Sequence, residues 1–240
     1  MELLVDTHTH TVASGHAYST VRENAILAKE LGMEAICCTD HGPALRNGAV
    51  DFIVTVLPAA PDVMEGIRVF NGAETNIVDF EGGIDIPDKF MRFTDFGIAS
   101  MHDIVIEPGT KEQNTNAMLG ALANKYIDVI GHPGNPHYDI DRETLVKDVK
   151  KRGKLIELNN HSFIYRKGSE PNCKDFLTLC KKHDVRITVS SDAHICYRVG
   201  AFDMVREALK EAEFPQELIV SRNLETFSGY IEERKNRLKG

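Results

Sequence analysis

Short apolar runs alternate with longer stretches of helical periodicity along most of this chain. The runs are apolar at consecutive positions, which is typical of parallel strands covered on both faces. They predict seven strands, at 2–6, 35–39, 68–72, 96–100, 127–130, 155–158 and 187–190. The periodic stretches predict helices at 20–31, 112–125, 142–152, 173–182, 202–212 and 225–239, the first capped by Ser19. Segment 48–60 is apolar but fits neither period.

Seven successive strand–helix steps favour a closed or nearly closed parallel barrel over a sandwich or a helix bundle. No repeat, linker or low-complexity segment interrupts the series, so we expect one α/β domain over residues 1–240. At this length, with 42% hydrophobic residues, the chain can bury one sizeable core.

Charge and composition exclude several classes of function. The chain carries 28 Lys and Arg against 36 Asp and Glu, a net charge of -8, and no basic run. This argues against a nucleic-acid coat and a membrane-surface binder. No stretch approaches the ~20 apolar residues of a membrane helix, and the start lacks a secretory pattern. The five cysteines show no metal-ligand spacing, and we expect reduced thiols in a cytoplasmic protein.

Potential metal ligands follow almost every predicted strand. In a parallel barrel the carboxyl ends of the strands lie on one face, where such folds build their sites. The candidates are His8, His10, His16, His41, Glu74, His102, His132, Asp192 and His194. Each has an ordinary structural alternative, such as a core histidine, a helix cap or a strand-end salt bridge. Their recurrence at successive strand ends favours a metal site. Imidazoles with a few carboxylates suit zinc, manganese or iron.

The ordered motifs resemble the PHP (polymerase and histidinol phosphatase) family, most closely its stand-alone bacterial phosphatases of the YcdX type. The resemblance rests on Asp6-Thr7-His8-Thr9-His10, Thr39-Asp40-His41-Gly42, Gly72-Ala73-Glu74, Gly131-His132-Pro133 and Ser191-Asp192-Ala193-His194, with His16 and His102 between them. It implies a distorted (β/α)7 TIM-like barrel with three Zn²⁺ per chain, which Mn²⁺ or Fe²⁺ could replace.

The resemblance also implies three ligand sets and a reaction. The first set is His8, His10, Glu74 and Asp192, the second is Glu74, His102 and His132, and the third is His16, His41 and His194. The implied activity is hydrolysis of a phosphomonoester of a small metabolite by a metal-bridging hydroxide. Glu74 and Asp192 would take part at the catalytic centre, and His161 is a candidate proton donor to the leaving group.

Several alternatives stay open at this point. The same centre could serve a phosphodiesterase or 3′-exonuclease, although no basic stripe is present to hold a nucleic acid, or a histidinol phosphatase. A binuclear amidohydrolase also begins with His-x-His, but it has no evident use for the third set of imidazoles. A zinc-storage module would be expected to use cysteines. The natural substrate, the metal in the cell and a homo-oligomeric state are left undecided, and the loops 43–48 and 163–171 are expected to set specificity.

Four arginines and two aspartates each have a functional and an ordinary structural interpretation. Arg22, Arg46, Arg166 and Arg198 follow strands and could meet a phosphate, although solvation is the commoner role of a single arginine. Asp6 and Asp40 adjoin predicted ligands, and either could orient a histidine or simply end a strand. His137 lies in a loop on the expected active face, and His183 is expected to cap a helix.

Overall fold

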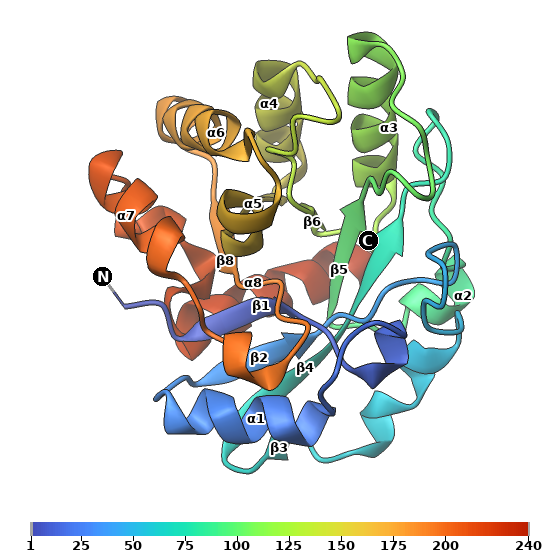
Figure 1. Ribbon diagram of the computed structural model, residues 1–240, viewed down its shortest axis with the longest axis vertical. Coiled ribbons are helices and arrows are strands. Elements are labelled where there is room, and N and C mark those ends of the chain that lie inside the picture. The colour runs from blue at the N-terminus through green and yellow to red at the C-terminus, as the bar shows by residue number, and fades with distance from the viewer. Residues whose placement is uncertain (1, 240) are drawn as a thin grey trace.

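The computed structural model describes residues 2–239, and its strands form a nearly closed barrel (Figure 1). Seven parallel strands pair in the order β1-β2-β4-β5-β6-β7-β8. They are β1 (Val5–Thr9), β2 (Ala35–Cys38), β4 (Ile67–Asn76), β5 (Phe96–Ser100), β6 (Val129–Ile130), β7 (Leu155–Asn159) and β8 (Ile187–Ser190). The two-residue β3 (Val63–Met64) pairs antiparallel with β4. The predicted α/β barrel class is therefore confirmed.

The barrel closes between its first and last strands through a few contacts. Thr7 Oγ1 lies 2.8 Å from Thr188 Oγ1, and the backbone N–H of Asp192 donates to the carbonyl of His8 over 3.0 Å. A single parallel bridge joins Thr9 to Ala193 beyond the end of β8. These contacts bring the segment after β8 against the segment after β1.

Helices cover the outside of the sheet and fill most of the connections (Figure 1). They are α1 (Val21–Glu30), α2 (Asp88–Met91), α3 (Lys111–Ala123), α4 (Arg142–Arg152), α5 (Asn160–Tyr165), α6 (Ser169–His183), α7 (Asp203–Glu211) and α8 (Leu224–Lys239). Six short 3₁₀ turns lie at Val12–Ser14, Ile53–Thr55, Leu57–Ala59, Cys196–Arg198, Gln216–Leu218 and Val220–Arg222. No helix within residues 2–239 is long and apolar enough to cross a bilayer.

Alternation along the strands divides the barrel interior into two halves. Side chains two residues apart on a strand share a face. The inward face of β4 therefore includes Phe70 and, nearer the carboxyl end, Glu74, and that of β7 includes Leu155 and, nearer the carboxyl end, Glu157. The apolar residues at the start of the strands form one cluster with α8. The polar residues at the carboxyl ends occupy the opposite half of the interior, where the candidate ligands lie.

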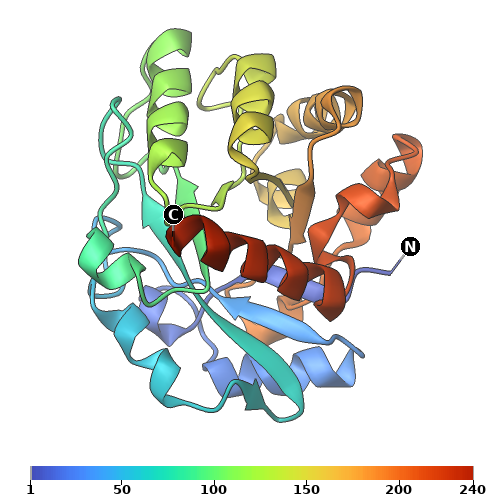
Figure 2. The same cartoon turned by 180° about the vertical axis from the view of Figure 1, so that it is seen from behind.

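Helix α8 closes the apolar end of the barrel (Figure 2). Phe227 and Tyr230 pack against Phe96, and the Arg234 side chain is 2% exposed. Arg234 Nε donates to Asp128 Oδ2 over 2.6 Å, and its Nη1 donates to the Thr94 carbonyl over 2.7 Å. A buried cation with these partners is compensated in charge and hydrogen bonding. The floor of the barrel is thus tied to the residue before β6 and to the segment before β5.

Candidate metal centre

The nine predicted ligands lie around one point at the carboxyl end of the barrel. His8 belongs to β1 and Glu74 to β4, while the other candidates lie in loops that begin within a few residues of a strand end. Neighbouring imidazole rings lie 4.2 to 5.2 Å apart, from His132 through His102, His41, His10 and His194 to His16. The strand-end pattern in the sequence therefore corresponds to a cluster in space.

Glu74 is the centre of this cluster and is fully buried. Its Oε2 lies 3.1 Å from His8 Nε2 and 2.7 Å from His41 Nδ1. Its Oε1 lies 3.1 Å from His132 Nε2 and 3.4 Å from His102 Nε2. The two carboxylate oxygens thus face different imidazoles, as a bridging ligand requires.

The first and third predicted ligand sets are also compact. His10 Nε2 lies 3.2 Å from Asp192 Oδ1, and His8 Nε2 lies 3.8 Å from the same oxygen. The rings of His16, His41 and His194 lie 4.6 to 5.7 Å apart. The boundaries between the sets are not sharp, because ligand atoms of His41, Glu74 and His102 also lie within 4.8 Å of one another.

Buried atoms that lack hydrogen-bonding geometry indicate that this cluster fits metal ions. Within residues 2–239, His8 Nε2, His10 Nε2, His41 Nδ1 and Glu74 Oε2 are buried and lack a partner at hydrogen-bonding geometry, although the three nitrogens lie 2.7 to 3.5 Å from Glu74 Oε2. Buried polar atoms are normally hydrogen-bonded, so four at one point without that geometry require an explanation. Cations coordinated by these nitrogen and oxygen atoms would satisfy them, and the donor set is one that zinc, manganese and iron accept.

The charge states of Glu74 and His10 agree with this donor set, whereas at His8 the carboxylates of Glu74 and Glu157 outweigh burial and hold the pKa well above its usual value, so a metal ion there would displace a proton. Burial alone would raise the pKa of Glu74, but the nearby imidazoles of His8, His41 and His102 outweigh it and hold that pKa well below the usual range. Burial lowers the pKa of His10 well below its usual value, and the neighbouring His41 lowers it further. Ionised carboxylates and neutral imidazoles are the protonation states that bind metals.

Two of the candidates adopt a backbone conformation that favours glycine. His132 has a φ of 34° and Asp192 a φ of 57°. Such a conformation costs of order 1 kcal/mol or more in a residue with a Cβ, and it persists where the surroundings impose it. Both residues turn the chain sharply after a strand, which directs their side chains to the centre of the cluster.

Further polar residues hold the imidazoles in place, and sequence reasoning missed the most important of them. Glu157 on β7 is buried, and its Oε1 lies 2.7 Å from His8 Nδ1. Its other oxygen accepts from the backbone N–H of His132. Asn76 Oδ1 lies 2.7 Å from His102 Nδ1. The sixth strand, which had no predicted ligand, therefore supplies a carboxylate that orients ligands from β1 and the loop after β6.

Asp40 and Asp6 have different roles. Asp40 accepts from Ser14 Oγ over 2.6 Å, and that hydroxyl lies 3.1 Å from His10 Nδ1, so Asp40 orients His10 through Ser14. Asp6 accepts from the backbone N–H groups of Ser191 and Gly200 and holds the loop after β8 instead of an imidazole. Burial raises the pKa of Asp6 to about 6.

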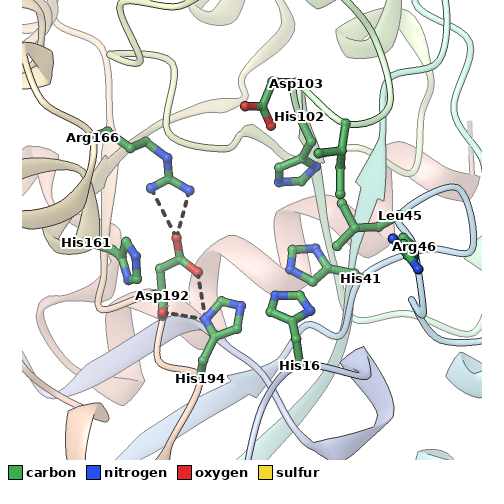
Figure 3. Close-up of a pocket in the computed structure, with 11 residues that line it drawn as sticks. His16, His41, Leu45, Arg46, His102, Asp103, His161, Arg166, Asp192 and His194 are labelled. Atoms are coloured by element: carbon green, nitrogen blue, oxygen red, sulfur yellow. Dashed lines mark hydrogen bonds and ion pairs between the residues drawn. The ribbon is translucent and has the colours of Figure 1, made fainter.

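A cavity of about 560 Å³ opens over the cluster (Figure 3). Arg166 and His161 border it on the same side as Asp192, and both Nη atoms of Arg166 lie 3.3 Å from Asp192 Oδ2. Ligand atoms of His161, Asp192 and His194 lie within 4.8 Å of one another. Arg46 borders the cavity on the opposite side. Arg166 is thus placed to contact a bound anion.

The remaining candidates lie elsewhere. Arg22 is exposed and pairs with Glu65 over 2.6 Å, and Arg198 is exposed in the turn after β8. His183 ends α6 and pairs with Glu143 over 2.9 Å. His137 borders a second cavity that it shares with Arg166 and His102.

Known proteins resemble this chain along its length. The model of the PHP domain family matches residues 6–232. A protein named probable phosphatase from Acetivibrio thermocellus is 48% identical over 239 residues, with 100% of this chain and 99% of that protein covered. Another of that name from Clostridium botulinum is 44% identical over 239 residues, with 100% and 98% covered.

A solved structure supports the fold. It is histidinol phosphate phosphatase from Lactococcus lactis, complexed with zinc, L-histidinol and phosphate, and it superposes with a TM-score of 0.64 at 19% identity, covering 89% of this chain and 95% of that one. At this identity the likeness shows the barrel alone. Because the family model spans nearly the whole chain and the relatives align from end to end, this chain belongs to the PHP domain family and is a hydrolytic enzyme.

Proposed function

We propose that this chain is a metal-dependent phosphatase that hydrolyses phosphomonoesters of a small metabolite. The nine residues of the cluster, Glu74 among them, would hold three divalent ions, with zinc as the first candidate and manganese or iron as substitutes. The observation that carries the proposal is the convergence on one point of four buried ligand atoms that lack hydrogen-bonding geometry. The names of the relatives and the zinc and phosphate of the Lactococcus lactis structure support it.

We place the enzyme in the cytoplasm and expect no nucleic-acid partner. A homo-oligomer is compatible with the proposal.

The charges of the centre favour an anionic substrate even though the protein is acidic. Only Glu74 and Asp192 among the nine ligands are anionic, so bound divalent ions would leave the cavity locally cationic. When bound, such ions act as Lewis acids on phosphoryl oxygens and activate water as a nucleophile near neutral pH. Arg166 adds a guanidinium on the wall beside Asp192, where it would contact phosphoryl oxygens and the charge that develops on them.

The chain's own residues supply the rest of the chemistry. Glu74 contacts imidazoles of the first and second sets through its two oxygens and would hold them in one geometry around the ions. His161 borders the cavity beside Asp192 and His194, and it would donate a proton to the leaving oxygen of the ester. Both carboxylates stay ionised throughout, because the low pKa of each excludes protonation near neutral pH.

Metal removal and reconstitution test this proposal. The purified protein is dialysed against a chelator, and release of 4-nitrophenol from 4-nitrophenyl phosphate is measured before and after addition of zinc or manganese. We expect the activity to disappear and return, with the number of bound ions counted in the same samples. Glu74→Gln should lose metal and activity together, whereas the exposed Glu30→Gln should not. Full activity without metal would contradict the proposal, and a preference for bis(4-nitrophenyl) phosphate would indicate a phosphodiesterase.

A further inference from the structure

The cavity over the metal centre has two chemically different walls. On the side of Asp192 it is bordered by Arg166 and His161, which carry charge or hydrogen-bonding groups. On the opposite side lies Leu45, with Arg46 beside it (Figure 3). Ile104 also borders the cavity, and among the described residues that line it Leu45 and Ile104 are the apolar ones, here called the apolar wall. The ester that binds here therefore meets both charged groups and an apolar surface.

Two turns build the apolar wall. Leu45 lies in the turn after β2, where its N–H donates to the carbonyl of Gly42 and its carbonyl accepts from Gly48 over 2.7 Å. Ile104 lies in the turn after β5, which is closed by the N–H groups of residues 105 and 106 donating to the carbonyl of His102. Both turns follow directly from predicted ligands. The wall is therefore fixed relative to the metal centre.

Of these two side chains, Ile104 offers the surface that a ligand could cover. Ile104 is 65% exposed, while Leu45 borders the cavity but is 5% exposed and already packed. Arg46 and Asp103 also border the cavity, but both are exposed and retain contact with water. Ligand pockets commonly combine such an apolar lining with a few placed polar groups.

We propose that the leaving group of the substrate is apolar and packs against Leu45 and Ile104. This inference rests on the proposed function, because it assumes that the phosphoryl group lies at the metal centre beside Arg166. The rest of the ester must then extend along a wall that offers few hydrogen bonds at its base. A polyhydroxylated leaving group would lose hydrogen bonds to water there, whereas an apolar one would gain from leaving water.

A pair of esters with similar leaving-group chemistry tests this proposal on the metal-loaded enzyme. Benzyl phosphate and 2-hydroxyethyl phosphate both release a primary alcohol, but only the first has an apolar body. We expect kcat/KM for benzyl phosphate to be at least roughly tenfold higher, a factor that a few methylene-sized contacts in an apolar pocket can supply. The non-hydrolysable benzylphosphonate should bind more tightly than 2-hydroxyethylphosphonate in calorimetry, which separates binding from chemistry.

Variants of Ile104 test whether the preference for an apolar leaving group arises from the apolar wall. Ile104→Ser should lower the ratio of the two kcat/KM values about tenfold, while Ile104→Leu should keep it. Leu31→Ser is the matched control, because Leu31 is 60% exposed at the end of α1 and outside the cavity. Equal hydrolysis of both esters, or an unchanged ratio in Ile104→Ser, would overturn the apolar leaving group and leave the phosphatase intact. Hydrolysis of neither ester, nor of 4-nitrophenyl phosphate, would overturn both.

Discussion

Glu157 shows how one buried carboxylate can organise ligands from two other segments. It contacts His8 Nδ1 and the N–H of His132, and Ser190 Oγ donates to its Oε1 over 2.6 Å. A carboxylate that accepts from the second nitrogen of a ligating imidazole fixes the orientation of the ring and strengthens it as a ligand. In the proposed reaction Glu157 would therefore position His8 and would not touch the substrate.

The variant Glu157→Gln should weaken metal binding without removing the ligands. We expect the zinc dissociation constant to rise roughly 10–100-fold, as for other residues that orient metal ligands. Competition with a fluorescent zinc chelator measures this, and activity should recover at high zinc concentration. The exposed Glu207→Gln is the control. An unchanged dissociation constant in Glu157→Gln would show that His8 does not depend on this contact.

His161 can be tested through the leaving group of the substrate. If it donates a proton to the leaving oxygen, His161→Asn should lower kcat for benzyl phosphate by about 10²-fold. The loss for 4-nitrophenyl phosphate should be much smaller, because 4-nitrophenolate leaves without a proton. His183→Asn, a histidine of similar type at the end of α6, is the control. Equal losses for the two esters would assign His161 to binding instead of proton transfer.

At the residue scale, the sequence predicts which candidate residues converge better than it predicts the residues that orient them. The nine candidates each follow a predicted strand, and a barrel brings strand ends together, so their proximity could be anticipated. Glu157 lies inside the apolar run Leu155–Leu158, where a carboxylate gives no pattern to recognise. Arg166 could not be separated from other arginines, because α5 carries it to the cavity and nothing in the sequence predicts that helix.

At the element scale, the predicted strands and long helices are confirmed with small shifts. Strands 96–100 and 187–190 and helix 142–152 have the predicted bounds. The first strand is shifted to Val5–Thr9, β4 extends to Asn76, and α6 begins four residues early.

The cap of α1 is Thr20 and not Ser19, and Thr20 forms a capping box with Glu23. Ser19 instead accepts from the N–H of Cys196. Short elements held by tertiary contacts, such as α2 and α5, have too few residues for a periodic signal.

Two helical glycines should respond in opposite directions to the same substitution. A Cβ at Gly120 in α3 would lie 1.9 Å from the carbonyl oxygen of Glu81, whereas a Cβ at Gly229 in α8 would meet nothing within 4 Å. Gly120→Ala should lower the free energy of unfolding by about 1–3 kcal/mol through overpacking. Gly229→Ala should raise it by about 0.5–1 kcal/mol, because alanine favours the helix. Urea unfolding measures both, and changes of the same sign would contradict this packing of α3.

At the scale of the whole molecule, Lys154 links stability to pH. Its side chain is 6% exposed, and Nζ donates to the carbonyls of Leu122 and Asn124 over 2.6 and 2.7 Å. Burial lowers the pKa of Lys154 from 10.5 to about 8, against the attraction of Asp128. Between these pH values the unfolded chain binds a proton that the folded chain has lost. The contribution of Lys154 to stability must therefore rise with pH in this window.

Comparison with Lys154→Met isolates this effect. The free energy of unfolding of the native protein minus that of the variant should rise by about 2 kcal/mol between pH 7 and pH 10. Urea unfolding with a chelator present keeps metal binding out of the measurement. Groups other than Lys154 titrate equally in both proteins and cancel in the difference. A difference that does not change with pH would show that the lysine is not desolvated in the folded state.

The floor of the barrel has a consequence for how the protein is made. Helix α8 packs beneath the sheet through Phe227, Tyr230 and Arg234, whereas the first imidazoles of the centre, at His8 and His10, precede it by more than 200 residues of chain. On the ribosome those histidines emerge long before the segment that seals the underside of the sheet. A nascent chain therefore displays the proposed metal ligands on an unfinished scaffold, and we expect stable loading with ions to wait until translation has passed Arg234.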